Sequence, residues 1–440
     1  MREDLRRGVC RNEQQTNLIS MKAILFTLIL LPAALIAQSD NSAQDAAGFL
    51  NRVEKTFESV GEVPAKEFVP AQLMSGQLHA VGQGAYSDGL RNTYVINVGN
   101  EQYEITGTPA LIERIYEIYA LDYLRGVSKS AEFGKAIASG GKEKVQSVVG
   151  IVKDPFGTIK RVPSGAARFF GRIGEGVKGG KSETEQGALA GVTGVTKAKV
   201  VLAAKLGVSP YTTNEDLQQA LTGVARASAG GGLVLSAATA AVGGAAGNVL
   251  SVVGMNQTLQ DVLVNSTPED LRILNRKKLL ALGVSRALAD EFLMHPWFSP
   301  WHETITTDAL VRIGVDPTVF IEDACKSFTQ EDALYFQRLA QILAQYSATA
   351  GPLRAFRRES RIVTALAKDG TLVVPVSLDY AIWAEHTARR TEDFIAIDKS
   401  RGDIKALALW TDGRLSERLK DEYKARNITW RERALDKPLR

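Results

Sequence analysis

Cysteine is scarce in this chain, which has only Cys10 and Cys325 among its 440 residues. A framework of several disulfides is therefore excluded, and stability must come from burial of apolar surface. The net charge of +4 is small for this length, so bulk charge gives no reason to expect a nucleic-acid partner. The 45% apolar content with 7% aromatics is typical of a chain that builds ordinary hydrophobic cores.

Motifs for catalysis and cofactor binding are missing as well. The chain has no G-x-S-x-G elbow, and its four histidines single out no partner for a serine or cysteine nucleophile. The stretch Gly174–Ser182 places Glu175 where a phosphate-binding loop requires glycine. We therefore expect no cofactor, and the sequence favours a non-catalytic protein over an enzyme.

Two histidines and two tryptophans lie close together in the stretch HPWFSPWHE, His295–Glu303. The spacing matches no common zinc motif, so we expect no metal site there. The pattern instead predicts a corner between helices, anchored by Trp297, Phe298 and Trp301, with Ser299 capping the next helix.

The clearest positive signal is an apolar run from Ala23 to Ala37 that follows Met21 and one lysine. This pattern predicts a secretory signal peptide over residues 21–39, cleaved after Ala37 or Ser39. Residues 1–20 then form a leader that precedes the true start. The mature protein is expected to be exported, and to be periplasmic or secreted.

The rest of the chain predicts an α+β fold that is mostly helical. We expect a small N-terminal antiparallel sheet with one helix, a central helical domain and a small C-terminal α/β module. The predicted boundaries are 40–130 for the α+β domain, 131–200 for a basic glycine-rich region, 201–350 for the helical domain and 351–440 for the α/β module.

Apolar and polar residues alternate over Tyr94–Val98 and Tyr103–Ile105, on either side of a Gly99–Asn100 turn. This pattern predicts a β-hairpin. Thr108 as N-cap and Pro109 in the first turn then open a helix that covers the sheet.

Three stretches in the middle of the chain share one local pattern, namely Leu206–Ser209, Leu282–Ser285 and Ile313–Asp316. Each has a glycine that can end a helix and a serine or aspartate that can cap the next one. Two further capped starts, at Thr267 and Ser299, support an all-helical domain.

The C-terminal part alternates between strand and helix patterns. A hairpin turning at Asp369–Gly370 is followed by a helix over Tyr380–Ile397, a strand over Lys405–Thr411, a helix over Arg414–Asn427 and a strand over Ile428–Glu432. This order is typical of parallel crossover units.

Open parallel sheets bind ligands beyond the carboxyl ends of their strands. Asp379, Thr411 and Asp412 stand at such ends, and His386 lies nearby in the sequence. These four are the candidate ligand-binding residues. Carboxylates in such positions also cap helices, and the sequence leaves that alternative open.

Residues 142–181 carry nine lysines or arginines and three acids, together with glycine, proline and phenylalanine. Short amphipathic helices here could bind an anionic membrane surface, with phenylalanines at the acyl boundary and cations at the headgroups. The candidate residues are Phe156, Lys160, Arg161, Arg168, Phe169, Phe170, Arg172, Ile173 and Lys178.

The stretch Ala227–Gln260 has no charged residue, but alanine and glycine make up nearly half of it and strongly apolar residues are few. It is too weakly hydrophobic for a typical membrane span, so a buried helical hairpin is favoured over membrane entry.

The favoured function is thus a non-catalytic envelope protein that contacts membrane or protein surfaces. The alternatives are an exported hydrolase or small-ligand binder that uses the C-terminal module, and a secreted effector that inserts into membranes.

Overall fold

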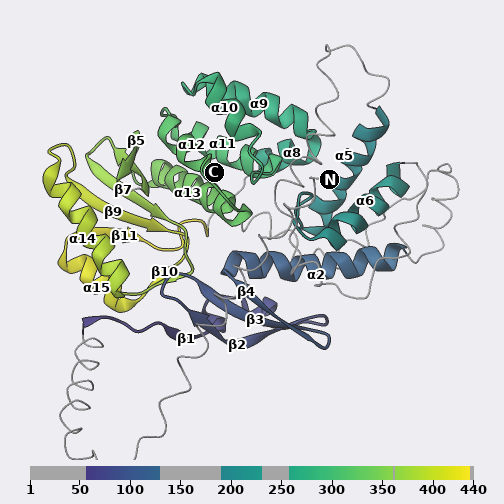
Figure 1. The fold of residues 1–440 in the computed structure, drawn as a ribbon, viewed down its shortest axis with the longest axis horizontal. Helices are drawn as coiled ribbons and strands as arrows, with labels where there is room; N and C mark the ends of the chain where they lie inside the picture. The colour runs from purple at the N-terminus through teal and green to yellow at the C-terminus, as the bar shows by residue number, and fades with distance from the viewer. Residues whose placement is uncertain (1–55, 129–189, 230–256, 360–361, 437–440) are drawn as a thin grey trace, which may run out of the picture. The chain divides into compact units, whose positions relative to one another are not determined.

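The computed structural model describes residues 56–128, 190–229, 257–359 and 362–436. All elements discussed below lie in one compact unit, Glu58–Arg440. The fold is α+β and mostly helical, as the sequence predicts, with an antiparallel sheet near the N-terminus and a mixed sheet near the C-terminus (Figure 1).

The first sheet has four antiparallel strands in the order β1-β2-β3-β4, followed by a long helix, α2. The bounds are β1 Gly61–Pro64, β2 Ala80–Ser87, β3 Asn92–Val98, β4 Glu101–Thr106 and α2 Thr108–Ser128, with short 3-10 turns η1 Ala65–Glu67 and η2 Ala71–Leu73.

The predicted hairpin is confirmed as β3 and β4, joined through Gly99 at a φ of 58°. Tyr94 and Ile96 point into the core, where they share a hydrophobic cluster with Leu111 and Ile115 of α2. Strand β2 was not predicted, because Gly82 and its neighbours weaken the strand pattern and the pairing with β3 shifts register there.

The central region is helical throughout its described residues. Its helices are α5 Ala190–Leu206, α6 Glu215–Ala229, α8 Gln257–Asn265, α9 Pro268–Ala281, α10 Arg286–Leu293, α11 Pro300–Ile313, α12 Thr318–Ala324 and α13 Gln330–Thr349.

The three predicted helix ends are confirmed, since Gly207, Gly283 and Gly314 all adopt positive φ. L-residues rarely adopt this conformation, whereas glycine does so at little cost. The prediction for Ser209 is wrong: α6 begins at Glu215, and the Asn214 side chain accepts from the Leu217 N–H instead.

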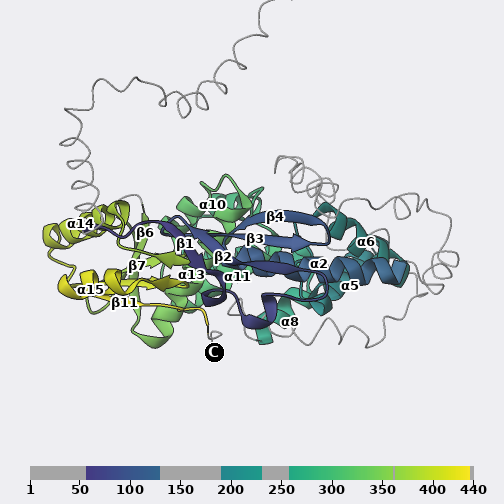
Figure 2. The same cartoon turned by 90° about the horizontal axis from the view of Figure 1, so that it is seen from below.

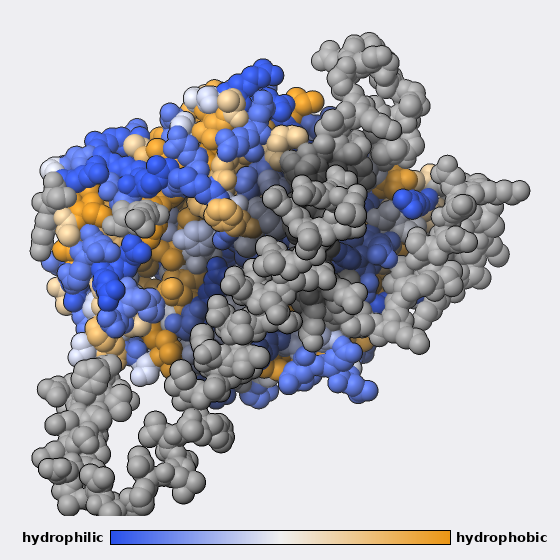
Figure 3. Space-filling view, viewed as in Figure 1, coloured by the Kyte–Doolittle hydropathy of each residue, from blue (hydrophilic) through white to orange (hydrophobic). Residues whose placement is uncertain are grey.

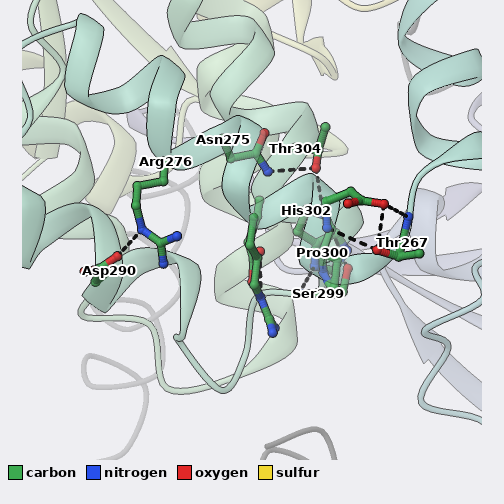
Figure 4. A network of polar contacts seen from close by, with 11 residues as sticks. Thr267, Asn275, Arg276, Asp290, Ser299, Pro300, His302 and Thr304 are labelled. Carbon is green, nitrogen blue, oxygen red and sulfur yellow. Dashed lines mark hydrogen bonds and ion pairs between the residues drawn. The ribbon is translucent and has the colours of Figure 1, made fainter. Parts of the chain in front are cut away.

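Side-chain caps fix the starts of several of these helices. Thr267 caps α9, Ser285 caps α10 and Ser299 caps α11, each accepting a hydrogen bond from a backbone N–H in the first turn. Figure 4 shows two contacts that join these helices: Asn275 donates to Thr304 at 2.8 Å, and Arg276 forms an ion pair with Asp290.

The C-terminal module holds a five-stranded sheet of order β11-β9-β7-β6-β5 and a two-stranded sheet of β10 and β8. Its elements are β5 Leu353–Glu359, β6 Ile362–Ala367, β7 Thr371–Val376, β8 Tyr380–Ala381, α14 Glu385–Ser400, β9 Ala406–Thr411, β10 Arg414–Leu415, α15 Glu417–Ala425 and β11 Ile428–Arg431.

The predicted crossover units are confirmed, because β7, β9 and β11 run parallel. Successive crossovers of one hand place α14 and α15 on the same face of the sheet. Helix α13 contacts β7 and β9, and it lies on the opposite side in Figures 1 and 2. Burial along almost all of β6 and β7 fits a sheet that is covered on both faces.

Both helices of the module begin later than predicted. Tyr380 pairs with Arg414 and Ala381 with Leu415, so the start of each predicted helix is a short parallel strand. Strand β5 was not predicted. Three of the seven residues in Leu353–Glu359 are arginines, so the sequence lacks a clear alternation of apolar and polar residues.

Among the described residues, no helix is long and apolar enough to cross a membrane. The face seen in Figure 3 carries hydrophilic residues with smaller groups of hydrophobic ones between them. Three predicted features lie outside the described residues: the signal peptide, the basic stretch 142–181 with all its candidate residues, and residues 230–256 of the uncharged stretch.

Candidate functional site

The carboxyl ends of β7 and β9 lie side by side, because Val376 is the register partner of Thr411. The residues that follow each strand therefore meet at one edge of the sheet. Three of the predicted candidates, Asp379, Thr411 and Asp412, come together here. The fourth, His386, is exposed on the first turn of α14, and within the described residues no hydrogen bond or ion pair joins it to this group.

Asp412 is held by partners on two other segments. Its Oδ1 accepts from the Leu378 N–H at 3.0 Å, and its Oδ2 accepts from the Ser377 hydroxyl at 2.8 Å. Arg338 of α13 adds an ion pair. The carboxylate thus ties the ends of β7 and β9 to α13. The hydroxyl of Thr411 is used locally, where it accepts from the Gly413 N–H at 3.1 Å.

Asp379 reaches out of the module to the N-terminal sheet. Its Oδ2 accepts from the Asn92 N–H and its Oδ1 from the Thr108 N–H, both at 2.9 Å. The second bond satisfies a backbone donor in the first turn of α2, where a negative charge is also favoured by the helix dipole. Burial raises the pKa of Asp379, and nearby Asp412 raises it further, while these backbone donors oppose the shift.

A short chain of polar side chains continues from Asp379 into the N-terminal core. Asn92 donates to the Tyr94 hydroxyl at 3.1 Å, and this hydroxyl lies 2.6 Å from the Thr108 hydroxyl. Burial raises the pKa of Tyr94 to about 12, so the phenol stays neutral in this chain. The Asn92 amide nitrogen and the two hydroxyls thus have partners, as a stable interior network requires, whereas the buried Asn92 Oδ1 has none among the described residues.

Backbone contacts reinforce the same junction. The carbonyl of Leu90 accepts from the N–H groups of Asp379 and Tyr380, and the carbonyl of Gly89 accepts from Ile382. Within the C-terminal module, Gly413 lies so close to the segment after β7 that an added Cβ would stand 2.1 Å from the Leu378 carbonyl oxygen. The β2–β3 loop of the N-terminal sheet thus occupies the edge where a parallel sheet usually admits a ligand.

The remaining side chains near Asp412 were not predicted. Tyr335 lies within electrostatic reach of both Asp412 and Arg91, and its pKa is raised to about 12, mainly by burial and then by Asp412. Arg338 stands 74 positions before Asp412 in the sequence. A sequence pattern cannot reveal such a partner, because it joins the aspartate only through the packing of α13 against the sheet.

Other candidate reactive groups serve the fold. Burial raises the pKa of the Cys325 thiol to about 12, so it stays protonated and unreactive. His295 Nε2 lies 3.0 Å from the Cys325 carbonyl, and the His302 ring accepts from the Ser299 N–H. Phe298 and Trp301 are buried at this predicted corner and Trp297 is partly buried.

No group of three or more metal-ligating side chains occurs in the described part of the chain. Comparison with known protein families, with curated proteins and with solved structures found no match.

Proposed function

We propose that this protein is exported and acts at the cell envelope as a non-catalytic protein that contacts an anionic membrane surface through its basic segment 142–181. The apolar run Ala23–Ala37 supports export, and the excess of lysine and arginine over acids in 142–181 supports the surface contact.

The observation that carries the proposal is how the helices on either side of this segment pack. Helix α2 ends before it and α5 begins after it, yet Leu124 of α2 and Leu202 of α5 belong to one hydrophobic cluster, together with Leu221 of α6. The described helices before and after the basic segment therefore pack in a single core. Such a base can present a segment to a surface without being part of the contact itself.

The described residues at the two ends of the uncharged stretch Ala227–Gln260 also pack in hydrophobic clusters. Ala227 of α6 lies in the same cluster as Leu202, whereas Leu259 of α8 packs in a second cluster with Val200. Helix α5 contributes to both clusters, so the same group of helices carries the flanks of both segments.

The second support is the use of polar groups at the sheet edge. Asp379 and Asp412 are engaged in bonds that join the two sheets and α13, and the β2–β3 loop lies over them. This arrangement favours a structural role for Asp379 and Asp412, the two residues on which the hydrolase and ligand-binding alternatives mainly depend.

The test is co-sedimentation of the mature protein with vesicles. We expect binding to phosphatidylglycerol-containing vesicles, little binding to pure phosphatidylcholine vesicles, and release as salt rises, because surface attraction is screened within about 8 Å at physiological ionic strength. Replacing five cations by glutamine should then reduce the partition coefficient at least a hundredfold, at about 1 kcal/mol per cation. The five are Lys160, Arg161, Arg168, Arg172 and Lys178.

A matched control replaces five exposed cations elsewhere by glutamine, so that it has the same net charge as the first variant. These are Lys277, Arg286, Arg389, Arg390 and Arg433. The control should bind like the unaltered protein if the basic segment makes the contact. Equal binding to neutral and anionic vesicles, or equal loss in both variants, would contradict the proposal. Resistance of the bound protein to carbonate extraction would favour membrane insertion by Ala227–Gln260 instead.

A further inference from the structure

A cavity of about 420 Å³ lies along one face of α2. Its wall combines the helix positions Arg114, Ile118, Leu121 and Arg125 with Asn97 at the end of β3 and Asn214 before α6. None of these residues was among the candidate site residues predicted from the sequence. The volume falls in the range of about 300–1,000 Å³ that is typical of sites for small molecules.

Arg125 is the unusual member of this wall. Its Nε and Nη2 atoms are buried and donate no hydrogen bond to any described residue. The nearest carboxylate is that of Asp216, whose Oδ2 lies 3.8 Å from Nη2, which is an ion pair but too long for a hydrogen bond. A guanidinium cannot shed its proton, and 25% of the Arg125 side chain stays exposed, so an anion in the cavity would add to the neutralisation that the long ion pair with Asp216 provides.

The other arginine is already neutralised. Arg114 forms an ion pair of 2.5 Å with Glu117, which in turn accepts a hydrogen bond from Thr212 in the loop before α6. This buried group fixes the shape of the cavity wall between α2 and α6. Arg125, whose ion pair with Asp216 is the longer of the two, therefore keeps more positive charge for a ligand, and the exposed Asp122 opposes it from the same wall.

We propose that this cavity binds a small organic anion, whose carboxylate or phosphate group pairs with the Arg125 guanidinium. The planar fork of arginine suits both oxyanions, because each can accept two parallel hydrogen bonds. Ile118 and Leu121 line the cavity beside the charge and fit the apolar part of such a ligand. The Asn97 amide nitrogen can donate to the oxyanion, whereas the Asn214 amide is already bonded to Leu217 and Glu117.

The test is isothermal titration calorimetry of the purified chain with three probes, inorganic phosphate, glycerol 3-phosphate and succinate. We expect saturable binding of at least one probe, and none of sodium chloride at equal ionic strength. Preference for the phosphates or for succinate then identifies the type of anion. Arg125→Met keeps the apolar stem and should weaken binding by about tenfold or more, the usual effect of losing a charged hydrogen bond.

Two further variants leave Arg125 in place. Asp122→Asn removes the opposing charge and should tighten binding severalfold. Asn97→Trp places a large ring at the exposed end of β3, where strands accept aromatic residues, and should block the cavity. Arg389→Met, at an exposed arginine of α14, is the matched control and should bind as the unaltered chain does.

The opposite shifts expected for Arg125→Met and Asp122→Asn separate a charge effect from loss of folding, since a misfolded chain cannot bind more tightly. The absence of saturable binding for all three probes would overturn the proposal. Equal affinity in the unaltered chain, Arg125→Met and Asn97→Trp would overturn it too.

Discussion

Asp379 accepts a hydrogen bond from the Thr108 N–H at 2.9 Å, although 271 positions separate the two residues in the sequence. The contact joins the carboxyl end of β7 to the first turn of α2. A second bond, to the Asn92 N–H, ties the same carboxylate to β3. One side chain thus fastens the N-terminal sheet and its helix to the C-terminal module.

Replacing Asp379 by alanine should therefore destabilise the whole unit. Two buried backbone donors would lose a charged acceptor, and hydrogen bonds to charged groups contribute about 1.5–3 kcal/mol each. We expect a loss of at least about 2 kcal/mol in the free energy of unfolding, measured by urea denaturation. Asp393→Ala, at an exposed aspartate of α14, serves as the control and should change it little. Equal stability of the two variants would show that the junction contributes nothing.

Gly413→Ala tests the close approach of the two segments that follow β7 and β9 within the C-terminal module. An added Cβ would stand 2.1 Å from the Leu378 carbonyl oxygen and 2.7 Å from that of Asp379, so the backbone must shift. Overpacking of this kind costs about 1–3 kcal/mol. The matched control is Gly402→Ala, where nothing lies within 4 Å of the new methyl group. Thermal unfolding of both variants should show a lower Tm for Gly413→Ala alone.

Glu113 should make stability fall as the pH rises towards neutrality. Burial, followed by the neighbouring charge of Glu117, raises the pKa of Glu113 to about 7 from its usual 4.5. The native state then holds the proton more tightly than the unfolded chain, so raising the pH from about 4.5 to about 7 favours unfolding. Glu113→Gln should raise the Tm at pH 8 and change it little at pH 4.

The control for this prediction is Glu104→Gln, at an exposed position of β4. It should leave the dependence of Tm on pH unaltered. A Tm difference between Glu113→Gln and the unaltered chain that stays constant from pH 4 to pH 8 would argue against ionisation of Glu113 as the cause.

Cys325 should resist alkylation in the native protein. With the pKa of its thiol at about 12, almost no thiolate is present at pH 8, and thiolate is the reactive form. Iodoacetamide should therefore modify the mature chain at least tenfold more slowly when folded than in urea, as followed by intact mass. A rate that is the same in both states would mean that burial does not protect the thiol.

Export predicts a defined N-terminus. Mass spectrometry of the native protein should find a chain that begins at Gln38 or Asp40 and is located outside the cytoplasmic membrane. Leu30→Arg, which places a charge inside the apolar run, should leave an unprocessed chain in the cytoplasm. Recovery of a native chain that retains Met1 would contradict the prediction.

Local features were the part of this fold that the sequence could predict. The hairpin at Gly99, the helix ends at Gly207, Gly283 and Gly314, and the cap at Ser299 all depend on residues within a few positions of one another. Turn and cap chemistry acts over that distance, so a short pattern carries it.

Strands with an irregular pattern were harder to predict. The glycines of β2 and the arginines of β5 interrupt the strand pattern in the sequence. These strands form because β2 pairs with β3 and β5 pairs with β6. Tertiary pairing overrides local preference at such positions.

The partners of the site residues lay beyond prediction. The position of Asp379 and Asp412 at the sheet edge follows from strand order, but their engagement with Thr108 and Arg338 depends on how α2 and α13 pack. The cavity beside Arg125 likewise exists only once β3, α2 and the loop before α6 are assembled.

The bond between Asp379 and Thr108 also bears on when the chain can fold. The N-terminal sheet is made first during synthesis, but the carboxylate that completes its junction follows 271 residues later. Contacts between such distant segments form slowly, because a long loop must close before they bring any gain in free energy. The N-terminal sheet and α2 therefore lack this hydrogen bond until most of the chain has been synthesised. Until Asp379 is made, the N–H groups of Asn92 and Thr108 lack the carboxylate that accepts from them in the finished fold.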